Sequence, residues 1–330
     1  MPKILITGCS GFIGSNFINY LLTNQKTEEI KVVNIDKLTY AGRGGNIEYI
    51  GHDKDPRYSF IKGDICDSEL IKRVIEEYNP KFVFNFAAES HVDRSIEGGL
   101  AFVKSNVEGT TNLLEASRNR GLEKFVQVST DEVYGSINNG SFSENSPLNP
   151  SSPYAASKAA AEHMAMAYFK THKVPLIITR SANNYGPFQF PEKLLSLFIT
   201  NLIYGRQVPL MWSKENPGLN KRDWLNVFDN CRAIWHVARQ GQVGEIYNIP
   251  GENERTNMEI TKMILDTFGF GEKMIKKIPH RKAHDFRYSI KGDKLRNLGF
   301  VYEHQDLNFE IKKVIDWYKK NRAWWDPLKK

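Results

Sequence analysis

The most constraining stretch of the chain is its N-terminus, where a near-continuous apolar run is followed by three evenly spaced glycines. Residues 2–7 have the composition of a parallel strand that is buried on both faces. Gly8, Gly11 and Gly14 follow, and the apolar side chains of residues 17–22 then fall on one helical face. Glycines in such a turn let the backbone approach a pyrophosphate and let the helix pack closely on the strand. The N-terminus therefore predicts a dinucleotide-binding strand, turn and helix.

Strand and helix patterns alternate through the first half of the chain. Short apolar runs predict further strands, and the segments between them have helical periodicity or a helix-forming composition. The predicted strands cover residues 31–35, 58–65, 82–88, 124–128 and 175–180, and the predicted helices cover residues 68–78, 95–120 and 153–172. This alternation predicts an α/β fold of the Rossmann type, with a doubly wound parallel sheet.

The alternation ends after residue 187, where the sequence becomes mixed, aromatic and punctuated by Pro and Gly. We predict that residues 1–187 form the dinucleotide-binding domain and that strands within residues 222–250 return to it. Residues 188–221 and 251–330 are predicted to form a smaller, mixed α/β lobe. A chain of 330 residues is long enough for both parts.

Acidic residues at strand ends indicate which dinucleotide binds. Asp36, after the second predicted strand, can accept hydrogen bonds from an adenosine ribose and would repel a 2′-phosphate, which favours NAD over NADP. Asp64 ends the third strand at a place suited to contact an adenine. Ala87 and Ala88 end the fourth strand and leave room for the dinucleotide backbone.

A phenol and an ammonium lie one helical turn apart at the start of the alanine-rich helix predicted for residues 153–172. Tyr154 would need its pKa lowered by about 3 units, or roughly 4 kcal/mol, to act as a base at neutral pH. Lys158 and the positive nicotinamide of NAD⁺ can together supply that shift. The alternative is a surface pair, since this spacing is common by chance. The nucleotide-binding pattern upstream, with Ser129 or Thr130 as a partner hydroxyl, favours alcohol oxidation.

Two adjacent carboxylates, Asp131 and Glu132, follow the fifth predicted strand, at the sheet edge where ligands bind in such folds. Once a sugar hydroxyl is oxidised to a ketone, one carboxylate can remove the acidified neighbouring proton and the other can protonate a departing hydroxyl. When two carboxyl groups lie close together, the pKa of one tends to be lower and that of the other higher. One group can then be ionised and act as the base while the other stays protonated and acts as the acid. Adjacent strand residues point to opposite faces, so both groups reach one substrate only if the backbone turns here.

Composition excludes several classes of protein. The net charge of +7 fits a solvated basic surface, or a bias toward anionic ligands. The sequence contains no dense stripe of basic residues interleaved with aromatic residues, so it does not predict nucleic-acid binding. Cys9, Cys66 and Cys231 are far apart, which argues against disulfides or a metal site. Neither a signal peptide nor a membrane-spanning apolar run is evident, so we expect a cytoplasmic protein.

Several motifs together resemble a known family. The glycine motif with Tyr154-x-x-x-Lys158 is similar to the extended short-chain dehydrogenase/reductases. Further stretches resemble the dTDP-glucose 4,6-dehydratases within them, across nearly the whole chain: residues 34–42, 87–95, 129–135, 183–187, 191–194 and 222–225. The Thr-Asp-Glu cluster is the specific part, because the related 4-epimerases carry small or polar residues there.

The resemblance implies roles for the catalytic cluster in making a 4-keto-6-deoxy sugar nucleotide from dTDP-glucose or UDP-glucose. Tyr154, assisted by Lys158, removes the proton of the sugar 4-hydroxyl, and Thr130 hydrogen-bonds that oxygen. Glu132 abstracts the proton at C5, and Asp131 protonates the departing 6-hydroxyl. The hydride taken by NAD returns to C6, so the cofactor is regenerated in place. No metal is implied.

The resemblance also implies a set of binding residues, a homodimer joined through helices, and sugar-nucleotide binding by the smaller lobe. The expected NAD-binding residues are Gly8, Gly11, Phe12, Ile13, Gly14, Asp36, Lys37, Leu38, Thr39, Asp64, Ile65, Ala87, Ala88, Ser105, Tyr154, Lys158 and Asn184. The expected substrate-binding residues are Ser90, Thr130, Asn183, Lys193, Leu194, Pro209, Leu210, Met211, Arg222, Asn257, Arg281 and His284.

Residues 208–218 and 281–285 depart from the family pattern on the nucleotide side, so thymine and uracil both stay open as the base. One methyl group is worth only ~1–3 kcal/mol in a pocket. Two other functions also stay open. One is a nucleotide-sugar 4-epimerase, and the other is a non-catalytic NAD- or RNA-binding scaffold.

Overall fold

A seven-stranded parallel sheet forms the centre of the computed structural model, which describes residues 2–24, 30–42, 45–282 and 284–329. The strand order is β10-β6-β5-β4-β1-β2-β3, so the order reverses between β1 and β4 and leaves a crevice at the carboxyl ends of the strands. The doubly wound fold predicted from the sequence is confirmed. The strands are β1 Lys3–Thr7, β2 Lys31–Asp36, β3 Tyr58–Lys62, β4 Phe82–Asn85, β5 Lys124–Thr130, β6 Leu176–Ser181 and β10 Ile246–Ile249.

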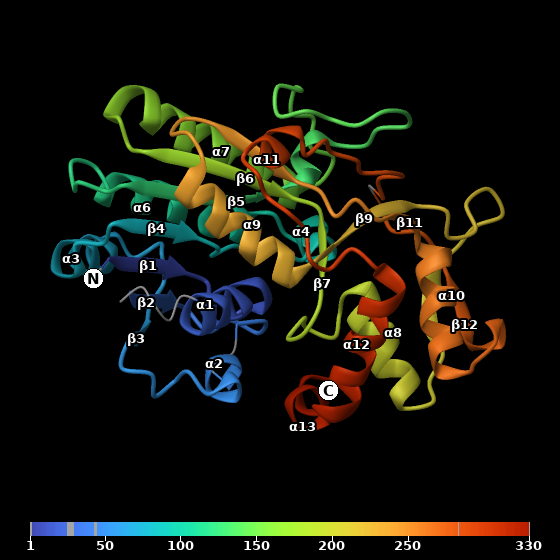
Figure 1. The fold of residues 1–330 in the computed structure, drawn as a ribbon. Helices are drawn as coiled ribbons and strands as arrows, with labels where there is room; N and C mark the ends of the chain where they lie inside the picture. The colour runs from blue at the N-terminus through green and yellow to red at the C-terminus, as the bar shows by residue number, and fades with distance from the viewer. Residues whose placement is uncertain (1, 25–29, 43–44, 283, 330) are drawn as a thin grey trace.

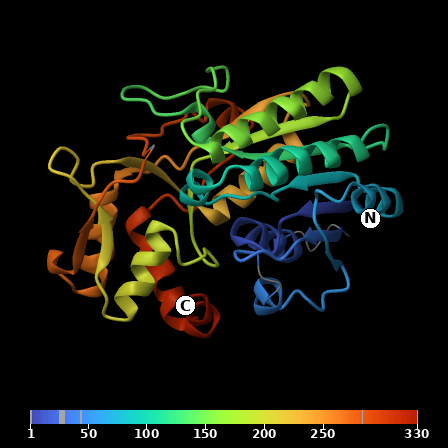
Figure 2. The same ribbon diagram turned by 180° about the vertical axis from the view of Figure 1, so that it is seen from behind.

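Helices cover both faces of this sheet, as Figures 1 and 2 show from opposite sides. One face carries α1 (Phe12–Asn24) and α9 (Val227–Gln240), and the other carries α3 (Ser68–Tyr78), α6 (Gly109–Ala116) and α7 (Pro153–His172). The short helix α2 (Gly45–Ile50) packs beside α1.

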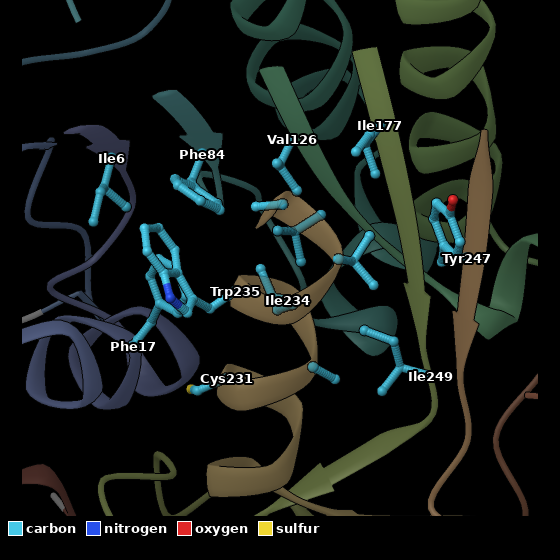
Figure 3. Packing of buried hydrophobic residues seen from close by; sticks show 14 of the residues in the cluster. Ile6, Phe17, Phe84, Val126, Ile177, Cys231, Ile234, Trp235, Tyr247 and Ile249 are labelled. Atoms are coloured by element: carbon cyan, nitrogen blue, oxygen red, sulfur yellow. The ribbon is translucent and has the colours of Figure 1, made fainter. Parts of the chain in front are cut away.

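Aliphatic and aromatic side chains fill the core between α1, α9 and the sheet (Figure 3). The ring centroids of Phe17 and Phe84 lie 4.9 Å apart, and those of Phe84 and Trp235 lie 6.0 Å apart, in tilted arrangements. Such pairs each contribute ~0.5–1.5 kcal/mol beyond their burial. The core therefore holds the strand ends, and the crevice above them, in a fixed arrangement.

The single helix predicted for residues 95–120 is wrong, because the chain breaks there into several pieces. Gly98 is extended (φ −163°), which ends the first piece, and a π-helical turn separates the next two. In this turn, Asn106 is buried, and its side chain bonds the backbone of Glu89 and the hydroxyl of Ser157. The pieces before α6 are α4 Val92–Glu97, α5 Leu100–Phe102 and the π-helix η1 Val103–Glu108.

The second part of the chain builds a smaller lobe with its own core around Phe198, Ile264, Ile315 and Trp325. In Figure 1 it lies to the right of the main sheet and contains the C-terminus. Its two-stranded parallel sheet pairs β8 with β12. The elements are α8 Leu194–Ile203, β8 Val208–Met211, α10 Asn257–Phe268, η3 Glu272–Met274, β12 Ile275–Ile278, α12 Leu307–Lys320, α13 Arg322–Trp325 and η4 Asp326–Leu328, while α11 (Asp293–Asn297) packs near β10.

Two strands were expected to return to the main sheet from residues 222–250. β10 joins that sheet, but β9 does not. β9 (Lys221–Asn226) lies between β7 (Asn183–Tyr185) and β11 (Glu254–Thr256) in a separate three-stranded sheet. The Asp223 carboxylate accepts hydrogen bonds from the backbone N–H groups of Gly251 and Asn253, at 2.7 and 2.8 Å. These bonds hold β9 beside the β10–β11 connection, away from the edge of the main sheet.

No helix within the described ranges combines the length and apolar character needed to cross a bilayer.

Candidate active site

A cavity of about 730 Å³ lies between the carboxyl ends of the strands and the lobe. The predicted catalytic residues Thr130, Asp131, Glu132, Tyr154 and Lys158 all line it. So do all the predicted substrate-binding residues, from Ser90 to His284, and all the predicted cofactor-binding residues except Leu38. Leu38 instead lines a neighbouring hollow, while its backbone N–H donates to Asp36 Oδ1 at 2.8 Å.

The glycine turn has room where a ligand would lie and none where the protein packs. Gly8 has a φ of +74°, and a Cβ there would come within 2.5 Å of the Ala87 backbone. A Cβ on Gly14 would come within 2.4 Å of Cys9. At Gly11 the nearest atom would be 3.4 Å away, so the protein alone barely requires a glycine there. Gly11 lines the cavity, which fits the close approach of a pyrophosphate.

The Asp36 carboxylate braces the turn from the end of β2. Its Oδ2 atom accepts a hydrogen bond from the Ser10 N–H at 2.9 Å, while Oδ1 accepts from Leu38. The neighbouring Lys37 does not pair with Asp36; its Nζ atom lies 2.7 Å from Oδ2 of Asp64, with which it forms an ion pair. A buried carboxylate at this strand end suits an adenosine ribose. The residues present therefore fit NAD.

The backbone turns directly after β5, as the chemistry of two adjacent carboxyl groups requires. Thr130 ends the strand, and a 3₁₀ turn, η2 (Asp131–Tyr134), begins at once. The Thr130 hydroxyl accepts the Glu132 N–H at 3.2 Å and lies 3.3 Å from Asp131 Oδ1. Both carboxyl groups line the same cavity because they lie on this turn and not on opposite faces of a strand.

The surroundings of the two carboxyl groups differ in charge. Asp131 is 2% exposed, and burial followed by the charges of Glu132 and Asp223 raises its pKa well above the usual range. Burial also raises the pKa of Glu132, but the cations of Lys193, Arg222 and Arg281 oppose that rise. Asp131 is therefore suited to hold a proton and Glu132 to lose one.

Helix α7 starts so that its first turn faces the acidic turn. The Ser152 hydroxyl caps it by accepting the Ala155 N–H at 3.2 Å, and Pro153 occupies the first turn. Tyr154 and Lys158 then lie on the buried face, and Lys158 Nζ donates to the Val128 carbonyl at 2.6 Å.

The protein by itself does not lower the pKa of Tyr154. Burial, and then the charges of Glu132 and Asp131, raise this pKa, although the Thr130 hydroxyl acts in the opposite direction. Burial lowers the pKa of Lys158 to about 8. The shift that the sequence analysis expected at the phenol thus needs the positive charge of a bound nicotinamide as well as Lys158.

The lobe side of the cavity is basic. The Arg222 guanidinium donates to the main-chain carbonyls of Asp285 (2.9 Å) and Phe286 (3.3 Å) and lies over the Tyr288 ring. Arg281 pairs with Asp93 at 3.1 Å, and Lys193 Nζ donates to the Ser90 carbonyl at 3.3 Å. Three cations converging on one wall suit a diphosphate.

His284 shares this basic wall and faces a second histidine. Its Nδ1 atom lies 3.0 Å from Nδ1 of His280, whose Nε2 lies 3.0 Å from the Asn216 carbonyl. Burial, and then the charges of Arg222 and Arg281, lower the pKa of His284 to about 3. His284 is therefore neutral at physiological pH in the protein by itself.

Several buried polar atoms on the cavity wall lack a hydrogen-bond partner among the residues that the structure describes. An unpartnered buried polar atom costs ~1–3 kcal/mol, so a group of them on one wall indicates a polar ligand. The atoms are Ser129 Oγ, Asp131 Oδ2, Asn183 Oδ1, Asn184 Oδ1, Gln189 Oε1, Trp224 Nε1 and Arg281 Nε.

Two residues of this group, Gln189 and Trp224, were missed by the sequence analysis. Gln189 Nε2 donates to the Asn184 carbonyl at 2.9 Å, and Gln189 Oε1 has no partner in the described part of the chain. Trp224 lies within the Arg-Asp-Trp-Leu stretch that carried the resemblance, so the motif was the available signal. Gln189 lies just beyond the Asn-Asn-Tyr-Gly-Pro stretch, and its role depends on the fold of that turn.

The chain is similar to known proteins in both sequence and structure. A family model described as GDP-mannose 4,6 dehydratase matches residues 5–316. The chain is 46% identical over 331 residues to the dTDP-glucose 4,6-dehydratase of Streptomyces antibioticus, covering 99% of this chain and 96% of that protein.

Two solved structures illustrate the range of similar folds. A dTDP-glucose 4,6-dehydratase from Streptomyces venezuelae with NAD and TYD bound has a TM-score of 0.94 and 44% identity, covering 99% of this chain and 100% of that chain. A UDP-glucose 4-epimerase from Thermotoga maritima with UDP-glucose has a TM-score of 0.87 but only 25% identity, covering 97% of this chain and 99% of the other.

The fold is thus common to dehydratases and epimerases, whereas high identity over the full length is found with the dehydratases. The extent of both sequence matches exceeds what a shared fold alone explains. The chain belongs to the dTDP-glucose 4,6-dehydratase family.

Proposed function

We propose that the chain is an NAD-dependent hydro-lyase that converts dTDP-glucose, or UDP-glucose, to the 4-keto-6-deoxy sugar nucleotide and water. The observation that carries this proposal is the buried Asp131 beside Glu132, on a turn that shares one cavity with Tyr154. An epimerase has no hydroxyl to expel and needs no such acid. The dehydratase relatives support the same conclusion.

NAD, when bound in the cradle of Gly8, Gly11 and Gly14, supplies a hydride acceptor at C4 and returns the hydride at C6. Tyr154 takes the proton of the 4-hydroxyl, and the Thr130 hydroxyl hydrogen-bonds that oxygen. The ammonium of Lys158, held one turn away, favours the phenolate. The new ketone acidifies the hydrogen at C5.

Glu132 then removes the C5 proton, and Asp131 delivers its proton to the departing 6-hydroxyl. When the hydride reaches C6, C5 is protonated again, which completes the 4-keto-6-deoxy sugar. The charge environments of the two groups suit these roles. Asp131 keeps its proton because it is buried beside other carboxylates, and Glu132 is ionised more easily because three cations surround it. Lys193, Arg222 and Arg281 hold the diphosphate at the same time.

We also propose the division of the chain that the sequence analysis expected. Residues 1–187, together with β10, form the NAD-binding domain, and residues 188–221 and 251–330 bind the sugar nucleotide. The core of the lobe is separate from the core of the sheet, which supports this division.

A second copy of the chain is proposed to pack against α7 and the segment before α6. Leu100 is 86% exposed and Val103 is 53% exposed, both beside α7, whose outer face carries alanines. A mass measurement in solution tests this: a dimer is expected, and Leu100→Asp should shift it toward monomer. A monomeric unmodified chain would contradict it.

The test of function is incubation with NAD and either dTDP-glucose or UDP-glucose, followed by mass spectrometry. The expected product is a sugar nucleotide lighter than its substrate by one water. The relative rates with the two substrates give the base preference. Formation of the galactose isomer, with unchanged mass, would establish the epimerase instead. Salt-resistant retention of RNA on filters without turnover would favour the scaffold alternative.

A further inference from the structure

A buried ion pair lies behind the catalytic residues, on the side away from the cavity. Arg180 on β6 is 3% exposed and Glu162 on α7 is 2% exposed. The guanidinium contacts both carboxylate oxygens, with Nε 3.0 Å from Oε2 and 3.2 Å from Oε1. Neither residue lines the cavity, and the proposed chemistry uses neither.

This ion pair joins the two catalytic clusters. Glu162 follows Tyr154 and Lys158 at helical spacing on the buried face of α7. On the other side, Arg180 Nη1 donates to the Tyr134 hydroxyl at 2.6 Å, and Tyr134 is the last residue of the η2 turn that begins with Asp131.

The hydrogen-bonded chain continues beyond the tyrosine. The Tyr134 hydroxyl donates to Asn248 Oδ1 at 2.8 Å, and the Asn248 N–H donates to Glu144 Oε1 at 3.1 Å. The Tyr134 ring also stacks on Phe142, with centroids 5.0 Å apart. The acidic turn is therefore tied to β6, β10 and the loop that carries Phe142 and Glu144.

Stability alone does not account for such a pair. Taking two charges out of water costs several kcal/mol each, and replacing a buried pair with apolar residues of similar volume is often neutral or stabilising. The ion pair provides a fixed geometry between β6 and α7, because the planar guanidinium group of Arg180 binds a carboxylate in one orientation. The reaction needs such a geometry, because acid, base and phenol must act on neighbouring carbon atoms of one sugar.

We infer that Glu162, Arg180 and Tyr134 are positioning residues, which fix the acidic turn relative to the phenol and ammonium of α7. The inference rests on the proposed dehydration. It predicts that weakening this network slows the elimination at C5 and C6 more than the oxidation at C4. The oxidation depends mainly on Tyr154 and Lys158, which lie on helix α7. The elimination depends on Asp131 and Glu132, which lie on the η2 turn that Tyr134 ends and anchors.

The mildest test is Tyr134→Phe, which removes one hydroxyl and keeps the stacked ring. We expect kcat for dehydration to fall about tenfold with KM unchanged within about twofold. Reduced-nicotinamide absorbance should build up during turnover, because oxidised sugar waits for elimination. Unchanged kcat, or a fall in kcat without that absorbance, would overturn the inference.

A double variant, Glu162→Leu with Arg180→Met, separates positioning from folding. We expect a melting temperature at or above that of the unmodified chain, with kcat about 10–100-fold lower and the same absorbance build-up. Normal kcat in this variant would show that the pair serves only the fold. Should it fail to fold, Tyr134→Phe decides the matter. The matched control is the exposed pair Lys262 and Glu272, changed together to glutamine, which should alter none of these readouts.

Product formation by the unmodified chain separates failure of the proposed dehydration from failure of the positioning role. If the unmodified chain forms no dehydrated product from either sugar nucleotide, the proposed function fails. If the unmodified chain dehydrates its substrate and the variants do so equally well, only the positioning role fails.

Discussion

On one side of the cavity the turn after β5 holds two adjacent carboxyl groups, and on the other side Lys193, Arg222 and Arg281 supply three cations. Burial is the main influence on the two carboxyl groups, and it raises the pKa of both Asp131 and Glu132. Arg222, among the cations, is held by the main-chain carbonyls of Asp285 and Phe286, which carry no net charge. We conclude that the acidic side is built for proton transfer and the basic side for binding an anion.

This comparison predicts that changes on the acidic side lower kcat and changes on the basic side raise KM. The largest effect is expected for Tyr154→Phe, because without the phenol nothing removes the proton of the 4-hydroxyl. We expect kcat to fall by ~10³–10⁴-fold, with no reduced-nicotinamide absorbance after mixing with substrate. The control is Tyr168→Phe, on the same helix, whose hydroxyl donates to Glu115 at 2.9 Å. Absorbance build-up in Tyr154→Phe would contradict the assignment.

Asp131→Asn should have the next largest effect, since an amide cannot protonate the departing hydroxyl. The expected loss of kcat is ~10²–10³-fold, while oxidation of the sugar persists and reduced-nicotinamide absorbance accumulates. Stopped-flow absorbance with mass analysis of the product checks both parts. Asp293→Asn, at an exposed position on α11, serves as the control. Turnover at the normal rate would remove Asp131 from the mechanism.

Lys158→Met should stabilise the fold while impairing catalysis. Burial lowers the pKa of Lys158 from its ordinary value of 10.5 to about 8 in the folded protein, so below pH 8 the folded state carries a buried ammonium. Removing it should raise the free energy of unfolding at pH 7 by roughly 3 kcal/mol, less the lost bond to Val128.

The sign of the pH dependence tests the origin of that gain. Between pH 8 and 10.5 the folded state binds fewer protons than the unfolded state, so the stability of the unmodified chain rises with pH. The advantage of Lys158→Met should therefore shrink as pH rises through this range, as measured by denaturant unfolding. Lys170→Met, at an exposed position on the same helix, should show no such trend. A constant advantage across the range would contradict the burial argument.

The smallest effect is expected on the basic side. Arg222→Lys keeps the charge but loses the planar fork, so KM should rise about tenfold, or ~1.4 kcal/mol, with kcat little changed. Arg255, which is exposed and directly opposite Arg222 in the β9–β11 ladder, provides the matched control as Arg255→Lys. A fall in kcat with constant KM would place Arg222 with the chemistry and break the comparison between the two sides.

The sequence by itself determined the parallel sheet, the glycine turn and the residues of the acidic and Tyr-Lys clusters. These features are local, because strand periodicity, turn glycines and a helical i,i+4 pair are written in neighbouring residues. Only the tertiary structure decided that β9 leaves the main sheet, that residues 95–120 break into pieces, and that Arg180 joins Glu162 to Tyr134. Each of these depends on partners distant in sequence, such as Asp223 with Gly251 or Asn106 with Ser157. The different surroundings of Asp131 and Glu132 also required the fold. Burial raises the pKa of both groups, but the cations of Lys193, Arg222 and Arg281 oppose that rise at Glu132.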